Sequence, residues 1–322
     1  MADLVFFLKT CLASKTLIAS LCGLLVVPPA AWLAVRLVAP YIRRMDNDPS
    51  WQAPLAAIAS AIPGAVFLVL AIVDLAGAQS SGCLQFVWGR IIVASILTLA
   101  IVAFMRATAV AYQRYTQIRR LIQHSHAPSD QVREAAKRVG VAVRIIPSPE
   151  PFCALAQPLR PLVLLSRGTL ERLDDGELEA ALRHERAHAL RGDLLLAAAV
   201  SFFADLLPLP VRDLTAIYNA ARELAADNHA VRKIAPHQLA SAILLLACAQ
   251  TFGHGVAALA EDTTNLKQRV LALLEGRAER TDLSGRRFMA ASVLSTIAVF
   301  SLMPAVLSAM NHYACTMQGM PH

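Results

Sequence analysis

The sequence predicts a mainly α-helical protein in which a bundle of four membrane-spanning helices carries one inserted α+β domain. Two observations support this fold class. Hydrophobic residues make up 56% of the 322 and the mean hydropathy is +0.51, which is more apolar than a soluble domain usually is. Charged residues make up only 16%, and they gather between long apolar runs. The net charge of +7 does not indicate nucleic-acid binding, because the basic residues flank apolar runs and no binding motif accompanies them.

Four segments are long enough to cross a bilayer, which takes about 20 apolar residues for roughly 30 Å of hydrocarbon. They are residues 16–38, 53–75, 86–105 and 288–310. Pro28 and Pro29 interrupt the first segment and Pro63 the second, as transmembrane helices tolerate where neighbouring groups satisfy the freed carbonyls. The chain therefore divides into a membrane region, a cytoplasmic domain, and a last span with a short external tail: 1–111, 112–287 and 288–322.

The loops between these segments predict the orientation. Basic residues next to the apolar segments are Arg43, Arg44, Arg106, Arg114, Arg119, Arg120, Arg286 and Arg287. The connection 77–85 has none, so the positive-inside rule places it outside and the domain 112–287 in the cytoplasm. Cys83 and Cys315 would both lie outside, and the sequence leaves open whether they form a disulfide. The six cysteines include no CxxC pair, which argues against a thiolate zinc site.

The cytoplasmic domain begins with a predicted helix that has Ser129 as its N-cap and ends near Gly140. Residues 141–146 are rich in β-branched side chains and predict a strand. Two further short strands are expected at 152–157 and 162–166. Because prolines bound this region, an edge position suits it better than a central one.

The next helix has clear start and stop signals. Asp174 is a good N-cap, Glu177 can complete a capping box, and Gly192 is well placed as the terminator. Between them lies an H-E-x-x-H motif at residues 184–188.

On a helix, His184 and His188 lie on one face, so both imidazoles can reach a single metal ion. Glu185 falls beside them, where it can take a proton from a metal-bound water. The alternative interpretation is a pair of surface histidines on an amphipathic helix. The capping box and the strands that precede the helix favour the metal site.

A zinc hydrolase usually has three protein ligands and one open position. Arg191 and Leu194 stand where an H-E-x-x-H-x-x-G-x-x-H site would need glycine and histidine, so that class is excluded. On a predicted helix at 211–231, Glu223 can be the third ligand, and Asp227, one turn later, can hydrogen-bond a ligand histidine. The alternative for this E-x-x-x-D pattern is a solvated helix face paired with neighbouring arginines.

The apolar segment 194–211 resembles a fifth span, but a single crossing would put Glu223 on the opposite side of the membrane from His184. Eighteen residues are too few to cross and return. We therefore expect a buried or interfacial helix that holds the site close to the bilayer, and a core helix at 239–248.

Three stretches resemble the BlaR/MecR type of membrane metallopeptidase. They are P-F-C-A-L-A-Q-P-L-R-P-L-V-L-L-S-R-G-T-L-E-R-L-D-D-G-E-L-E-A-A-L, H-E-R-A-H-A-L-R-G-D and R-E-L-A-A-D-N-H-A-V. The tract 267–270 is also similar to a stretch of that group, and the HtpX and CAAX prenyl proteases are more distantly similar. The resemblance implies a gluzincin-type domain in a bacterial cytoplasmic membrane, with Zn²⁺ bound by His184, His188 and Glu223 and with Glu185 as general base.

The expected activity is hydrolysis of peptide bonds in cytoplasmic or membrane-proximal proteins, with repressor cleavage as an analogy from the related systems. Besides the lipid bilayer, the expected partner is therefore a protein or peptide, paired as an extended strand with the edge formed by 152–157 or 162–166. Antibiotic-sensing members carry a penicillin-binding domain after the last span, whereas only a short tail follows Met310, so covalent capture of β-lactams is not expected. The alternative function is a non-catalytic signal transducer. The oligomeric state is not indicated.

Overall fold

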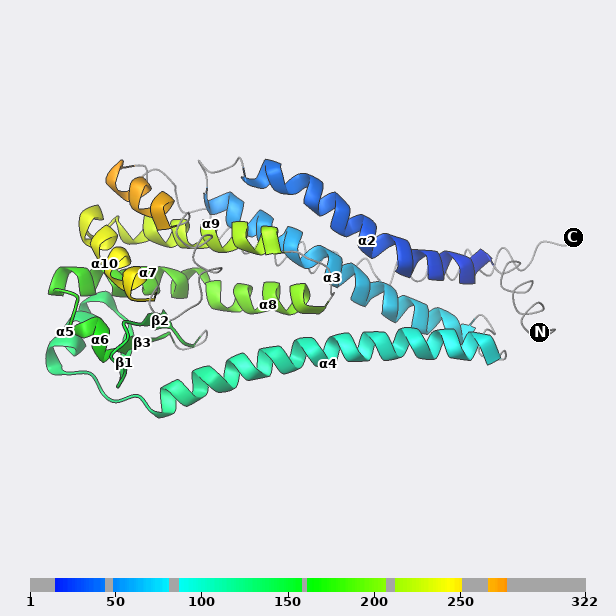
Figure 1. Ribbon diagram of the computed structural model, residues 1–322, viewed down its shortest axis with the longest axis horizontal. Coiled ribbons are helices and arrows are strands. Elements are labelled where there is room, and N and C mark those ends of the chain that lie inside the picture. Colours follow the sequence, from blue (N-terminus) through cyan, green and yellow to red (C-terminus); the bar gives the residue numbers. More distant parts are fainter. Residues whose placement is uncertain are drawn as a thin grey trace, which may run out of the picture.

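The computed structural model describes residues 15–43, 49–80, 87–157, 161–206, 212–250 and 266–276. The fold is mainly helical with one small sheet (Figure 1). The helices α2 (Lys15–Arg43), α3 (Pro49–Ser80) and α4 (Val87–Gln123) are long, and they extend away from the end of the molecule that holds the sheet and the shorter helices. The predicted fourth span, Cys83 and Cys315 lie outside the described residues.

The three long helices cover the first three predicted spans. Within the described residues, one segment, Gln52–Ile72 of α3, is long and apolar enough to cross a membrane by length and composition. The helix α4 runs on well beyond the span predicted at 86–105, through the predicted domain boundary at residue 111. Its last turns bring Ile118 and Ile122 against the sheet.

The sheet consists of β1 (Ala142–Ile146), β2 (Cys153–Leu155) and β3 (Leu162–Ser166) in the order β1-β3-β2. The strand β3 pairs in parallel with β1 and antiparallel with β2. All three strands were expected, and β2 lies at an edge as the prolines indicate. The prediction that 162–166 forms an edge is wrong, because β3 pairs with both β1 and β2. Pro161 permits this central position, since it stands just before the strand and removes no hydrogen bond from its ladder.

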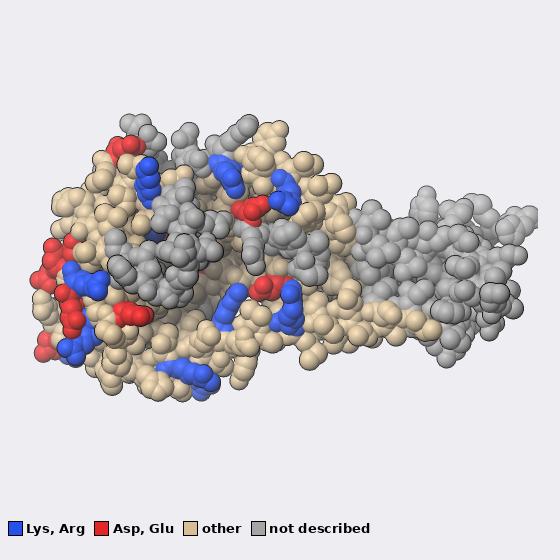
Figure 2. Space-filling view, viewed as in Figure 1, with Lys and Arg blue, Asp and Glu red and all other residues tan. Residues whose placement is uncertain are grey.

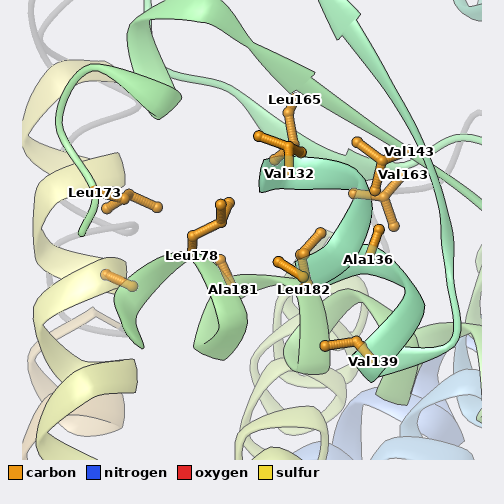
Figure 3. Packing of buried hydrophobic residues seen from close by; sticks show 12 residues of the cluster. Val132, Ala136, Val139, Val143, Val163, Leu165, Leu173, Leu178, Ala181 and Leu182 are labelled. Atoms are coloured by element: carbon orange, nitrogen blue, oxygen red, sulfur yellow. The ribbon is translucent and has the colours of Figure 1, made fainter. Parts of the chain in front are cut away.

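The helix α7 (Asp175–Arg191) is packed against the sheet and against α5 (Asp130–Val139). Figure 3 shows the buried side chains between them, which include Val139, Val163 and Leu182. Burying such an aliphatic side chain stabilises the fold by about 1.5–3 kcal/mol. Because Leu182 lies in this core, the residues that follow it on α7 are held in place.

The helix boundaries in this domain follow local signals. Gly140 ends α5 in the left-handed conformation with φ of 79°. Ser129 precedes α5 as its N-cap, as predicted, but its side chain makes no capping hydrogen bond. The short helix α6 (Arg167–Leu170) was not predicted. Its first turn is capped by Ser166, whose side chain accepts a hydrogen bond from the Thr169 amide.

The helices α8 (Asp193–Leu206) and α9 (Arg212–Ala230) follow α7, and run in opposite directions along α3 (Figure 1). Leu206 is buried in one cluster with Phe67 and Ala71 of α3. Within the described residues, 194–206 of the apolar segment predicted at 194–211 form a helix packed against α3, which reaches more than halfway along the predicted span 53–75. The helix α10 (Pro236–Gln250) and a helix at 266–274 complete the described domain.

The contact between α3 and α8 depends on Gly64. A Cβ atom added there would stand 2.2 Å from the Phe203 carbonyl oxygen of α8, so the two helices would have to move apart. We expect Gly64→Ala to destabilise the protein by about 1–3 kcal/mol, as overpacking does. The measurement is the thermal unfolding temperature of the detergent-solubilised protein. Ile62→Val, at a partly exposed position of the same helix, is the control, and equal unfolding temperatures for the two variants would contradict this explanation.

Candidate metal centre

The helix α7 places His184 and His188 on one face. Its start is fixed by the predicted capping box, in which Asp174 Oδ1 accepts from the Glu177 amide at 2.8 Å and Glu177 Oε2 accepts from the Asp174 amide at 3.0 Å. Its end is fixed by Gly192 in the left-handed conformation, with φ of 68°. Between these ends the two imidazole Nε2 atoms lie 3.1 Å apart.

The helix α9 brings Glu223 to these two histidines. Glu223 Oε2 lies 3.2 Å from His184 Nε2, and Glu223 Oε1 lies 3.6 Å from His188 Nε2. One ligand atom from each of the three residues lies within 4.8 Å of the others. The structure thus brings together the three side chains that the sequence proposes as metal ligands, although Glu223 lies 39 residues beyond His184 in the sequence.

A carboxylate faces the second ring nitrogen of each histidine. His184 Nδ1 lies 2.9 Å from Asp227 Oδ1, in line with the E-x-x-x-D prediction, and Asp227 is fully buried. His188 Nδ1 lies 2.8 Å from Asp193 Oδ2, and Asp193 is also buried. In a neutral imidazole, a carboxylate beside Nδ1 favours the hydrogen on Nδ1 and directs the Nε2 lone pair to a metal.

Sequence reasoning missed Asp193, although its position carried a signal. It is the first residue after the predicted terminator Gly192, whose left-handed conformation makes the turn that ends α7. A carboxylate immediately after such a turn can reach a histidine in the last turn of the helix. The carboxylate behind His188 is therefore as local in sequence as the H-E-x-x-H motif itself.

Arg269 and Arg222 contact the carboxylates of Asp227 and Glu223. Arg269, on the helix 266–274, donates to Asp227 through Nε at 2.7 Å and through Nη2 at 2.9 Å. Its Nη1 also lies 3.4 Å from Glu223 Oε2. Arg222 Nη2 donates to Glu223 Oε1 at 2.9 Å, as the alternative interpretation of the E-x-x-x-D pattern anticipates. That pairing does not turn Glu223 towards solvent, because its carboxylate still contacts both histidines.

Glu185 stands between the two histidines and the edge strand. Its Oε2 accepts a hydrogen bond from the Leu155 amide of β2 at 2.7 Å. Leu155 directs its amide away from β3, because backbone amides alternate in direction along a strand and the amide of the next residue, Ala156, donates to Leu162 of β3. Burial raises the pKa of Glu185, although the neighbouring histidines oppose this shift. A carboxylate with a raised pKa is suited to accept and release a proton near neutral pH.

The charges around the histidines are strongly coupled. Burial alone would lower the pKa of His184, but its contacts with Asp227 and Glu223 outweigh burial and raise that pKa to about 10. Burial opposes ionisation of Glu223, yet the two histidines hold its pKa well below the ordinary value. Without a metal, these groups therefore favour protonated imidazole beside ionised carboxylate. A metal ion that binds there must displace protons from the histidines.

The donor set fits zinc. Two imidazole nitrogens and one carboxylate are a ligand combination found in zinc hydrolases, which keep a fourth position open. Each imidazole is also oriented by a carboxylate, as is usual for histidines that bind zinc.

The known proteins that this chain resembles are peptidases. The model of the BlaR1 peptidase M56 family matches residues 29–273. A protease HtpX homologue of Pelotomaculum thermopropionicum is 35% identical over 92 residues, which are 26% of this chain and 33% of that protein. An HtpX homologue of Moorella thermoacetica is 35% identical over 81 residues, or 24% and 27% of the two chains.

A third relative, the protease HtpX homologue 1 of Streptomyces coelicolor, is 28% identical over 108 residues, or 34% of each chain. This chain thus spans about a third or less of the curated relatives it matches, and their similarity is local. The family match, in contrast, covers most of the chain, including both ligand-bearing helices and Arg269. The chain therefore belongs to the BlaR1 peptidase M56 family.

Proposed function

We propose that this protein is an integral-membrane zinc metalloendopeptidase that hydrolyses peptide bonds of cytoplasmic or membrane-proximal proteins. The observation that carries the proposal is the convergence of His184, His188 and Glu223, whose ligand atoms lie within 4.8 Å of one another. Glu185, on the same helix as both histidines, supplies a buried carboxylate beside them. Membership of a peptidase family supports the same reaction class.

The chemistry divides between the ion and the chain. When bound, zinc supplies Lewis acidity, which acidifies a coordinated water and polarises the scissile carbonyl. His184, His188 and Glu223 hold the ion. Glu185 acts as general base: it accepts a proton from the attacking water and delivers it to the leaving amine. The Leu155 amide holds Glu185 Oε2 in place for this step.

The substrate is proposed to bind as an extended strand along β2. This strand is the edge of the sheet next to the metal centre, because β3 is paired on both sides. Main-chain hydrogen bonds to such an edge give affinity with little selectivity for side chains. Substrate choice would then depend on which segments reach the site in an extended conformation.

The position of the site favours segments close to the membrane. Tyr218 of α9 is buried in one cluster with Ala53 and Ala56, at the start of the predicted second span. Glu223 follows Tyr218 by five residues, about 8 Å along the helix axis. The metal centre therefore lies near the cytoplasmic boundary of that span in the proposed four-span topology. Charged side chains in Figure 2 gather towards the end that holds the sheet, while the far stretch of α4 is tan.

Regulatory cleavage, such as that of a repressor, is proposed by analogy with the BlaR/MecR type alone. The rival function is a non-catalytic signal transducer that keeps the peptidase fold. Such a protein would normally have lost the general base or one of the ligands. Glu185 and all three ligand candidates are present here, which favours the enzyme.

The test uses the full chain purified in detergent. We expect about one zinc ion per chain by elemental analysis and cleavage of an unstructured protein such as casein. A chelator should abolish cleavage, and added zinc should restore it. A protein that binds no zinc would refute the metal site, while one zinc per chain without cleavage would favour the signal transducer.

A further inference from the structure

The metal centre includes a contact from a part of the chain that lies outside both ligand-bearing helices. Arg269 belongs to the helix at 266–274, which is orange in Figure 1 and lies near α9 and α10. The sequence singles out the tract around it without giving it a role. Its guanidinium makes two hydrogen bonds to Asp227 and approaches Glu223, so one side chain contacts both the third ligand and the carboxylate behind the first.

Asp227 depends on these contacts because it has no access to water. Its Oδ1 faces His184 Nδ1 and Arg269 Nη2, each at 2.9 Å, and its Oδ2 accepts from Arg269 Nε at 2.7 Å. A fully buried carboxylate is costly unless its oxygens are hydrogen-bonded. Arg269 supplies both oxygens with a donor and thereby fixes the plane of the carboxylate that orients His184.

Arginine is suited to this task by its shape. Its planar guanidinium offers several N–H donors in a fixed fork, so it can bind one carboxylate with two atoms and direct a third nitrogen elsewhere. Here Nε and Nη2 bind Asp227, while Nη1 lies 3.4 Å from Glu223 Oε2. A lysine ammonium at this position could not keep all three relationships at once.

The helix that carries Arg269 is itself fixed to both ligand-bearing helices. Leu273 is only 1% exposed and shares a buried cluster with Ala180 of α7, Ala230 of α9 and Leu239 of α10. Val270 packs against the same cluster. The guanidinium is therefore presented from a packed helix, and its position depends on α7, α9 and α10 together.

From these contacts we propose that Arg269 is a positioning residue of the metal centre, which sets zinc affinity through Asp227 by fixing the carboxylate that orients His184. The inference rests on the proposed zinc site and adds the helix 266–274 to it. When Arg269 is lost, the Asp227 carboxylate keeps its contact with His184 but loses the two hydrogen bonds from the guanidinium. The carboxylate then no longer holds the imidazole in one orientation.

The test compares Arg269→Met and Arg269→Lys with Lys267→Met, an exposed position on the same helix. Zinc dissociation constants are measured on the detergent-solubilised full chain by competition with a chromophoric chelator. Removing a group that orients a zinc ligand typically weakens binding 10–100-fold, and we expect a loss of about this size for Arg269→Met. Arg269→Lys should recover only part of the affinity, and Lys267→Met should bind as the wild type does.

A second measurement separates positioning from a general effect on folding. Arg269→Met is repeated in an Asp227→Asn background, and thermal unfolding of every metal-free variant is recorded. If Arg269 acts through Asp227, its loss should weaken zinc binding much less in that background than alone. Equal losses in both backgrounds would overturn the inference, as would wild-type zinc affinity in Arg269→Met. A wild-type chain without zinc would instead refute the proposed function.

Discussion

Glu185→Gln slows peptide hydrolysis by about two to four orders of magnitude while zinc stays bound, which is the largest effect on activity that we expect. Glutamine keeps the shape of the side chain, and its amide oxygen can still accept the Leu155 hydrogen bond, which is 2.7 Å long in the native site. It cannot accept a proton at neutral pH. General acid–base catalysis contributes roughly 10²–10⁴-fold to such reactions, so kcat/KM should fall by about that factor.

The measurement pairs the cleavage rate with zinc content for each purified variant. Glu171→Gln, at an exposed glutamate paired with Arg167, is the control and should retain both. Full zinc with full activity in Glu185→Gln would show that another group accepts the proton. Zinc loss in Glu185→Gln would mean that this carboxylate helps to hold the ion.

Glu223→Gln should have the largest effect on the metal. Glu223 is the ligand candidate from α9, and it joins that helix to the histidine pair of α7. A neutral amide is a much poorer ligand for zinc than a carboxylate. Changes in groups that merely orient a ligand cost about 10–100-fold in affinity, and we expect a loss of at least about 100-fold when the ligand itself is altered.

Zinc affinity by chelator competition measures this loss. Asp213→Asn on the same helix is the control, because Asp213 is exposed and pairs with Arg36 of α2. Unchanged zinc affinity in Glu223→Gln would restore the interpretation of the E-x-x-x-D pattern as a helix face paired with arginine. It would also require a different third ligand for the two histidines.

Local rules account for the parts of the site that the sequence predicts. The capping box, the glycine terminator and the spacing of His184 and His188 all operate within about one turn of a helix. The same rule relates Glu223 to Asp227. These features depend little on the rest of the fold, so they can be read without knowing it.

The parts that the sequence did not predict depend on longer-range packing. Arg269 lies 42 residues from Asp227, and no local spacing relates the two. The central position of β3 depends on its pairing with both β1 and β2, which a proline at residue 161 does not reveal. Apolar windows likewise detect where α4 is hydrophobic, but its polar last turns are equally compatible with a helix.

The unbroken course of α4 has a mechanical consequence. About 18 residues of this helix extend past the apolar stretch that ends near residue 105, which is about 27 Å at 1.5 Å per residue. A membrane-spanning helix tilts when bilayer thickness changes. In the proposed four-span topology, a tilt of α4 by about 10° would move the far end of this arm by about 5 Å. Ile118 and Ile122 on that arm pack against a buried cluster that includes Ala156, the residue after the Leu155 amide that contacts Glu185. In the proposed topology, a change in lipid composition would therefore shift β2 and the carboxylate of Glu185, the proposed general base.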